Sequence, residues 1–368
     1  MDYHFTPEQD QFREILSRFL RDKSPASVAR ATLEEGHTYD AGLWQQLCGE
    51  LGLAGLHIPE AYGGAGYGPV EQAIVMEEQG RALLCAPFLA SAVMAGHAIL
   101  QAGTEAQKQA LLPGIADGSV VAALAVTEQQ GLWDKADIQL AASPSEDGFV
   151  LNGGKSFVID GQVADLLVVA GRTKVGLSLF TVDAGAEGVV VTPLQAVDTT
   201  RKLAAINFEN APAQLLGEDG GADLQRLNNA VLVALANEAI GGAQAMLDAA
   251  VEYAKMRVQF GRVIGSFQGI KHRLADLMVE VELAKAAAYQ AAQILADGDD
   301  ATIAASQAKA AASDVYLHAA EECIQFHGGI GFTWENDTHL WFKRAKSSEV
   351  FMGTPAEHRE RLLQAMGV

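Results

Sequence analysis

Hydrophobic residues recur at helical spacing through the first third of the chain. After Thr6 and Pro7, which suit a helix cap and a first turn, apolar residues three and four positions apart predict an amphipathic helix to about Leu20. The same spacing predicts four more helices, at residues 41–51, 69–84, 89–102 and 105–116. The first third is therefore expected to be helical throughout.

Near Gly118 the pattern changes to short, partly alternating apolar segments separated by turn residues. The expected strands lie at residues 120–127, 138–142, 149–151, 155–159, 166–171, 177–182, 188–193 and 204–208. No crossover helix fits between them, which disfavours parallel βαβ units. The middle of the chain is therefore predicted to be an antiparallel β barrel or sandwich.

Helical periodicity returns at about Ala222 and continues to the end. Residues 224–257 are rich in alanine and apolar on most sides, which is typical of a helix buried in a bundle. More helices are expected at residues 268–296, 301–325, 341–350 and 355–366, and their short connections favour a four-helix bundle. The sequence thus predicts a multidomain α+β protein. Its expected parts are an N-terminal helical domain (1–118), a middle β domain (119–218) and a C-terminal helical bundle domain (219–368).

Charge narrows the choice of partners. With 26 basic and 46 acidic residues the formal net charge is -20, so neither nucleic acid nor an anionic membrane is expected as the main partner. An anionic ligand would need a local basic patch. Two groups of residues could form one: Arg257, Arg262, Lys271 and Arg273, and then Lys343, Arg344 and Lys346. The alternative for many of these side chains is a solvated helix face.

The three cysteines, Cys48, Cys85 and Cys323, are far apart and do not form a CxxC pair. Neither a disulfide framework nor a metal site is therefore expected. The first residues lack the basic and apolar regions of a signal peptide, and no apolar run is long enough to suggest a membrane span. These observations predict a cytoplasmic protein.

A glycine-rich turn between two helical segments is the first candidate for chemistry. It lies within residues 325–354, where His327 is followed by Gly328, Gly329 and, two residues later, Gly331. Glycine lets another chain or a ligand approach the backbone closely, although such a run more often ends a helix. The turn alone leaves both interpretations open.

Five further segments along the chain help to interpret the glycine-rich turn. They are FTPEQDQFR from Phe5, LGLAGLHIPEAYGGAGYG from Leu51, AVTE from Ala125, LNGGKSFVIDG from Leu151 and RVQFGRVIGSFQGIKHRLAD from Arg257. With residues 325–354 they resemble the acyl-CoA dehydrogenase family of flavoproteins over nearly the whole chain. The resemblance implies FAD between the β domain and the C-terminal bundle. It also implies oxidation of an acyl-CoA thioester to the trans-2-enoyl-CoA, with electrons passing to an electron-transfer flavoprotein.

The resemblance assigns the flavin ring to the β domain. Val126 and Thr127 would border the ring, with the Thr127 hydroxyl as a donor, and Glu128 would border the substrate thioester. The alternative for Thr127 is a buried threonine satisfied by the backbone. Phe157 and Val158 match the aromatic and apolar pair beside the ring, whereas Ile159 could contribute only its backbone. Trp133 stands where the family has a small residue, so its indole is expected to crowd the loop that admits the substrate.

The other cofactor residues fall in the C-terminal bundle. Arg257, Gln259 and Phe260 match residues that reach the FAD of a neighbouring subunit, and arginine suits a pyrophosphate because its planar fork donates twice. Gln268 and Gln325 would bind the adenine half, and Gly328 and Gly329 would allow its close approach. Thr354 is also assigned to the cofactor, and Met352 and Gly353 to the substrate.

One departure concerns the catalytic base. The family's usual glutamate, in a pattern of aromatic, Glu, Gly, Thr, aligns with Met352, and the other position used in the family aligns with Val231. The nearest acid in that helix is Glu238, on the face of Val231 but about 10 Å along the axis. Glu238 is therefore the candidate base, and its alternative is a buried ion pair with an arginine. His272, His327 and His339 are lesser candidates.

Three functions remain open from the sequence. The favoured one is an acyl-CoA dehydrogenase subunit, in a homo-oligomer or with a homologous partner that supplies the glutamate, as in bacterial members acting on bulky thioesters such as steroid side chains. The second is a non-catalytic scaffold that completes a partner's FAD site. The third is a related flavin oxidase or monooxygenase, since those enzymes can dispense with the glutamate.

Overall fold

The structure is a computed structural model that describes residues 5–34 and 38–367. The chain divides into two compact units. Among the described residues, the bundle unit consists of residues 5–31, 69–84 and 232–367, and the sheet unit of residues 32–34, 38–68 and 85–231. Each unit is therefore built from segments far apart in the sequence.

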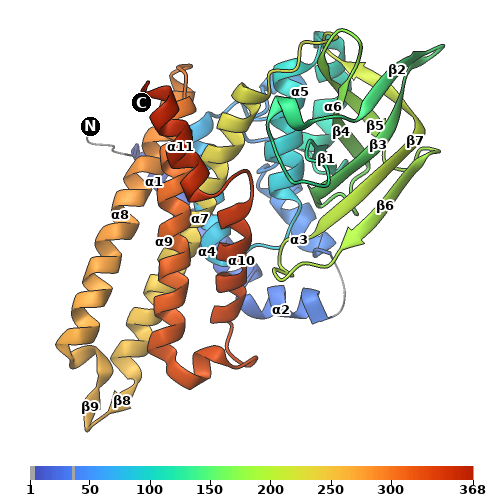
Figure 1. The fold of residues 1–368 in the computed structure, drawn as a ribbon. Coiled ribbons are helices and arrows are strands. Elements are labelled where there is room, and N and C mark those ends of the chain that lie inside the picture. Colours follow the sequence, from blue (N-terminus) through green and yellow to red (C-terminus); the bar gives the residue numbers. More distant parts are fainter. Residues whose placement is uncertain (1–4, 35–37, 368) are drawn as a thin grey trace. The chain divides into compact units, whose positions relative to one another are not determined.

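Long helices form the bundle unit. They are α1 (Pro7–Lys23), the start of α2 (Ala26–Glu34), α4 (Pro69–Ala82), α7 (Leu224–Met256, from residue 232 on), α8 (Gln268–Ala296), α9 (Thr302–His327), α10 (Thr338–Val350) and α11 (Pro355–Ala365). Figure 1 shows α7, α8 and α9 running side by side, and α10 and α11 pack against α9. Between α7 and α8 lie a hairpin of β8 (Val258–Gln259) and β9 (Arg262–Val263) and the turn η5 (Ile264–Ser266). The turn η6 (Gly328–Phe332) follows α9.

Capping chemistry sets several of these helix ends. The Thr6 hydroxyl accepts a hydrogen bond from the Gln9 amide, and the Gln9 side chain accepts one from the Thr6 amide, which completes a capping box ahead of Pro7. Thr354 and Glu357 form the same arrangement at the start of α11. Gly328, with φ +64°, ends α9, which is one of the two interpretations that the sequence left open for this glycine run.

Two glycines bring α4 and α7 into backbone contact. A Cβ on Gly80 would lie 1.9 Å from the carbonyl oxygen of Glu238, and one on Gly241 would lie 1.8 Å from that of Glu77. No side chain fits at either position. The crossing of the two helices therefore depends on glycine at both of its contact points.

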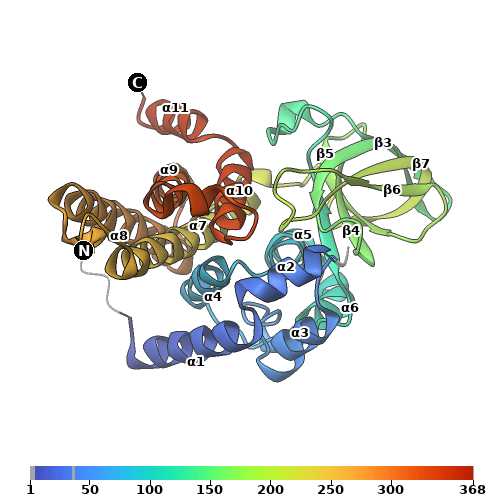
Figure 2. The same cartoon turned by 90° about the horizontal axis from the view of Figure 1, so that it is seen from below.

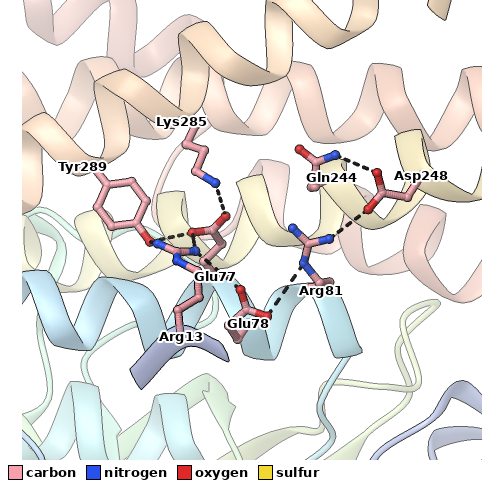
Figure 3. A network of polar contacts seen from close by, with 8 residues as sticks. All are labelled: Arg13, Glu77, Glu78, Arg81, Gln244, Asp248, Lys285 and Tyr289. Carbon is pink, nitrogen blue, oxygen red and sulfur yellow. Dashed lines mark hydrogen bonds and ion pairs between the residues drawn. The ribbon is translucent and has the colours of Figure 1, made fainter. Parts of the chain in front are cut away.

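A buried polar network joins α1, α4 and α8 beside that crossing (Figure 3). Glu77, only 1% exposed, accepts hydrogen bonds from the Tyr289 hydroxyl (2.5 Å), from Lys285 (2.8 Å) and from Arg13. Burial alone would raise the pKa of Glu77, but Arg13 and Lys285 outweigh it and lower that pKa. Arg81 extends the network to Asp248 on α7 at 2.8 Å.

The sheet unit combines short helices with a closed sheet. Its helical segments are α3 (Ala41–Gln45), the π-helical turns η1 (Gln46–Glu50) and η3 (Leu89–Ala95), η2 (Glu60–Tyr62), α5 (Gly96–Ala102), α6 (Glu105–Ala116) and η4 (Lys135–Asp137). Its strands are β1 (Ala122–Ala125), β2 (Ala141–Ser145), β3 (Gly148–Ile159), β4 (Leu166–Arg172), β5 (Leu177–Asp183), β6 (Val189–Leu194) and β7 (Leu203–Leu216).

Strand pairing explains why a barrel was the right expectation. Neighbours run in the order β4, β2, β3, β7, β5, and β5 pairs with β4 again, so the sheet closes on itself. Leu151, Phe180 and Phe208 belong to the core that these strands enclose, and Figure 2 shows the strands from a second side. Most pairings are antiparallel, but β1 runs parallel to β4, which makes the sheet mixed. A loop with the short turn η4 and one hairpin, β2–β3, connect these two strands, so no long crossover helix is needed for the parallel pairing.

Helix α7 also resembles a membrane span in length and composition. It is the one described helix long and apolar enough for this, and 89% of its most apolar stretch is buried inside the protein. A buried core helix passes the same test.

Candidate functional site

In the sheet unit, residues 126–128 are fastened to β3 by hydrogen bonds in both directions. The Thr127 hydroxyl donates to the Ser156 carbonyl (2.5 Å), and the Ser156 amide donates to the Thr127 carbonyl (2.9 Å). A hydroxyl has one proton to donate, so Thr127 would have to release Ser156 to serve as a donor to a ring. The structure thus has the backbone-satisfied threonine that the sequence left as an alternative.

Lys155 is a second, wholly buried link at the same place. Its ammonium donates to the Val126 carbonyl (2.8 Å) and to Oε1 of Glu128 (3.0 Å). The same Glu128 oxygen accepts the backbone amides of Gln139 and Leu140, each at 2.8 Å. Oε1 of Glu128, the residue expected to border the substrate, therefore holds the loop before β2 in place.

Burial and pairing change how both groups titrate. Burial lowers the pKa of Lys155 to about 8, although Glu128 works in the opposite direction. Burial would raise the pKa of Glu128, but the amides of Leu140 and Gln139 and the Lys155 ammonium together lower it. The sequence analysis did not single out Lys155. It could have been noticed as a charged residue in a predicted strand whose other residues are mostly apolar.

Phe157, within β3, has an unusual backbone conformation. Its φ is +58°, where a side chain other than glycine is strained, and it lies where the pairing of β3 with β7 slips between Lys155 and Val158. The slip leaves the phenyl ring 40% exposed, whereas Val158 and Ile159 are each 2% exposed. A Cβ on Gly131 would lie 3.4 Å from this ring, so the loop after Glu128 passes close to it. An exposed ring on a rigid strand fits the role of a floor for a planar cofactor.

Trp133, whose indole was expected to crowd the loop that admits the substrate, is buried in the structure. Its indole is 8% exposed, and the neighbouring Leu132 is the exposed residue at 45%.

In the bundle unit, the residues assigned to the adenine half of FAD gather at one end of the helices. Tyr253, near the end of α7, stacks on His327 at the end of α9, with ring centres 4.1 Å apart. Arg273, near the start of α8, lies over the Phe326 ring at 5.3 Å. These contacts bring three helix ends together. The predicted residues at this end are all exposed: Arg257, Gln259, Phe260, Gln268, Gln325, Gly328 and Gly329.

That end of the bundle unit is suited to a bound dinucleotide or another chain. Phe260, at the tip of the β8–β9 hairpin, is 92% exposed and has φ +53°. A Cβ added at position 328 or 329 would meet no atom of the described residues within 4 Å, so the backbone is open to close approach. With the exposed guanidinium of Arg257, these residues offer an apolar contact, an open backbone and a cation. The side chains present therefore fit the cofactor that the resemblance implies.

The turn between α10 and α11 holds the residues assigned to the thioester. Met352 is 2% exposed and has φ +62°, and Gly353 has φ +109°. Thr354, assigned to the cofactor, uses its hydroxyl in the cap of α11, where it donates to Glu357 Oε2 at 2.9 Å. The Thr354 backbone and side chain lower the pKa of Glu357. That carboxylate is therefore occupied in the cap.

Glu238 is found in a buried ion pair. Nη1 of Arg344 on α10 lies 2.8 Å from Glu238 Oε1, and the side chains are 4% and 7% exposed. This is the alternative that the sequence left open for Glu238. Breaking such a pair leaves a buried charge without its counterion, so a structural role accounts for both residues.

Backbone strain marks three of the predicted site residues. The residues other than glycine with positive φ in the described chain are Leu83, Phe157, Asp160, Asn210, Phe260 and Met352. Of these, Phe157, Phe260 and Met352 had been assigned to cofactor or substrate. Strain of this kind persists where the surroundings enforce it, which is common at functional sites.

Comparison with known proteins is consistent with this arrangement. Models described as acyl-CoA dehydrogenase N-terminal, middle and C-terminal domains match residues 6–119, 123–211 and 223–367. Acyl-CoA dehydrogenase IpdE2 of Mycobacterium tuberculosis is 35% identical over 355 residues, covering 96% of each protein.

Two solved structures share the fold over nearly all of both chains. One comes from work on the electron transferring flavoprotein of Acidaminococcus fermentans, with TM-score 0.92, 29% identity, and 100% of this chain and 99% of that chain covered. The other is a variant of the Tcur3481-Tcur3483 steroid ACAD, with TM-score 0.89, 32% identity and 98% of each chain covered. The chain belongs to the acyl-CoA dehydrogenase family, whose members are FAD-dependent oxidoreductases acting on CH–CH groups.

Proposed function

We propose that this chain is an acyl-CoA dehydrogenase subunit that works with a homologous partner, and that the partner supplies the carboxylate that takes the α proton of the thioester. The observation that carries the proposal is Met352 at the position of the family's usual base. A thioether cannot accept a proton at neutral pH, so the chain's own residue at that place cannot begin the reaction.

Three acids on α7, α10 and α11 already have partners of their own in the structure. Glu238 is paired with Arg344, and Glu357 caps α11. Glu349 at the end of α10 pairs with Lys346 at 2.5 Å. These commitments support an outside source for the base.

The chain's own residues have binding and positioning roles in this proposal. FAD, once bound, supplies the hydride acceptor for the β carbon. Phe157 offers the ring an aromatic surface, and Lys155 fixes the backbone of residues 126–128 through Val126 and Glu128. Arg257 and Phe260 extend towards the FAD of a neighbouring subunit, which fits their exposure.

The class of substrate and the partners follow by similarity. One relative of known structure is described as a steroid ACAD named for two proteins, which supports a bulky acyl-CoA thioester and a two-chain assembly here. Another belongs to work on an electron transferring flavoprotein, which supports that class of protein as the electron acceptor. We expect the assembly to act in the cytoplasm.

The decisive experiment is the visible spectrum of the purified protein, followed by anaerobic titration with a series of acyl-CoAs, alone and mixed with a homologous subunit. We expect flavin that no thioester bleaches in the isolated chain and that bleaches in the mixture. Bleaching of the isolated chain would refute the need for a partner's base. A mixture that stays oxidised would favour a scaffold role, and thioester-dependent oxygen consumption would favour an oxidase.

A gain-of-function variant tests the assignment of position 352 directly. Met352→Glu should allow thioester-dependent bleaching without the partner, because it returns a carboxylate to the family's usual position. Met352→Gln is the matched control, since it has the same shape and cannot accept the proton. Equal behaviour of the two variants would mean that residue 352 does not stand at the reacting carbon.

A further inference from the structure

Lys309 is a buried ammonium with an uncommon set of partners. It lies on α9, is 1% exposed, and donates to the Ser313 hydroxyl and to the Ser348 carbonyl, each at 2.9 Å. It also reaches the carbonyls of Glu349 at 3.3 Å and Gly353 at 3.4 Å. A buried lysine must be compensated by hydrogen bonds, and here most of its partners are backbone atoms of another segment.

Those carbonyls belong to the end of α10 and to the turn after it. The last four carbonyls of a helix have no partner within the helix and carry its negative dipole end, where a cation is favourable. Lys309 therefore caps the C-terminus of α10 from a neighbouring helix. Through Gly353 the same ammonium also holds the turn that contains Met352.

The turn needs such support because its backbone is strained. Met352 has φ +62°, which a residue with a side chain adopts only where its surroundings enforce it. On the other side of the turn, a Cβ on Gly353 would lie 3.2 Å from Nε2 of His358, so the fully buried imidazole packs under the peptide. Burial is the main cause that lowers the pKa of His358 to about 4, and the charges of Lys309 and Arg361 act in the same direction. This ring is therefore neutral near pH 7.

A second buried cation fixes the middle of the same helix. Arg344 on α10 is paired with Glu238 on α7 at 2.8 Å. The helix before the turn is thus fastened at two points, by Arg344 to α7 and by Lys309 to α9. Contacts outside the side chain of residue 352 therefore contribute to setting its position.

We propose that Lys309 is a positioning residue that holds the turn at residues 351–354 and so fixes where the side chain of residue 352 stands. The position stays preorganised although Met352 has replaced the carboxylate. The inference rests on the proposed function only in assuming that position 352 is the place of the family's catalytic base.

Hydrogen exchange of backbone amides tests the structural part without any substrate or flavin. In Lys309→Met we expect the amides of residues 351–353 to exchange at least about 10-fold faster, with α8 unchanged. The matched control is Lys346→Met, which removes a 55%-exposed lysine from α10 itself and should leave the turn as it is. Faster exchange throughout the bundle, or none at the turn, would overturn the proposal.

Combination with Met352→Glu tests the functional part. The single variant should be bleached by a thioester, and adding Lys309→Met should slow bleaching at least about 10-fold, whereas adding Lys346→Met should not. Equal rates in the two double variants would overturn the role of Lys309. If Met352→Glu itself is not bleached, the assignment of position 352 fails, and the exchange experiment still decides whether Lys309 holds the turn.

A milder variant covers the case in which Lys309→Met does not fold. Lys309→Gln keeps a polar side chain that can donate hydrogen bonds, but it removes the positive charge from the carbonyls at the end of α10. Faster exchange confined to residues 351–353 would again support the proposal. Exchange identical to that of the unaltered protein would contradict it.

Discussion

Lys155 is the residue whose environment most directly predicts a dependence on pH. Its ammonium is fully buried in the sheet unit, and its pKa is about 8 compared with 10.5 for a free lysine. Between these two values the unfolded chain binds more protons than the folded chain. The contribution of Lys155 to stability is therefore complete only above about pH 10.5, and it falls as the pH drops through 8.

Lys155→Met should remove this dependence. The free energy of unfolding of the unaltered protein, measured relative to the variant, should rise by on the order of 3 kcal/mol between pH 8 and pH 10.5. Urea unfolding of both proteins at several pH values measures the difference. A constant difference across this range would mean that Lys155 is not an ionised buried group below pH 8.

Among the site residues, the resemblance marked places where the backbone is unusual, but the sequence could not identify pairings between residues far apart in the chain. Phe157 and Met352 stand out in the structure through left-handed backbone, at places that the resemblance had marked. The pairing of Glu238 with Arg344 joins residues 106 positions apart and could be posed from sequence only as an alternative. The contacts of Lys309 with the end of α10 were equally inaccessible, since the local sequence pattern does not show which carbonyls a buried lysine will contact.

At the scale of elements, the crossing of α4 and α7 has the least tolerance for change. Gly241→Ala would place a methyl group 1.8 Å from the Glu77 carbonyl. Backbone cannot move away as a flexible side chain can, so we expect a loss of about 3 kcal/mol or more in the free energy of unfolding. Thermal or urea unfolding measures the loss.

Gly269→Ala is the matched control for this substitution. Gly269 lies in α8, and a Cβ added there would meet no described atom within 4 Å. The variant should gain up to about 1 kcal/mol because alanine favours helix. Similar stabilities for the two variants would show that α4 and α7 can separate without cost.

The helices were predictable where apolar residues recur at helical spacing between residues that start or end a helix. The helix expected at residues 268–296 is α8 (Gln268–Ala296). Long-range geometry was less accessible. The two strands expected at 149–151 and 155–159 form one strand, β3, with a bulge, because the interruption at Gly153 and Gly154 is absorbed by pairing with β7. The parallel pairing of β1 with β4 likewise depends on partners far apart in the chain.

At the scale of the whole molecule, exposed apolar residues on the β8–β9 hairpin indicate an oligomer. Phe260 is 92% exposed, and Met256 and Val258 beside it are 69% and 56% exposed. Apolar groups gathered at one hairpin are typical of a surface covered by another chain. This exposure agrees with the proposed role of the hairpin in reaching a neighbouring subunit's cofactor.

Phe260→Ser should therefore lower the mass of the assembly and its bound flavin together, without changing the helical content. Sedimentation and the ratio of visible to ultraviolet absorbance measure the two effects. Val197→Ser, at a 78%-exposed position in the sheet unit, is the control and should change neither. If the Phe260→Ser variant dissociates but keeps its full content of flavin, the hairpin does not contribute to cofactor binding.

Burial of Lys155 and Lys309 has a chemical consequence for a protein that handles thioesters. Acyl-CoAs are themselves acylating agents, and an amine attacks them when it is both unprotonated and accessible. With its pKa near 8, Lys155 is unprotonated more often than a free lysine, so lack of access is what keeps it from attacking a thioester. Its side chain is 0% exposed and Lys309 is 1% exposed, so spontaneous acylation is confined to lysines on the surface. The two amines that shape the interior are protected from damage by the protein's own class of substrate.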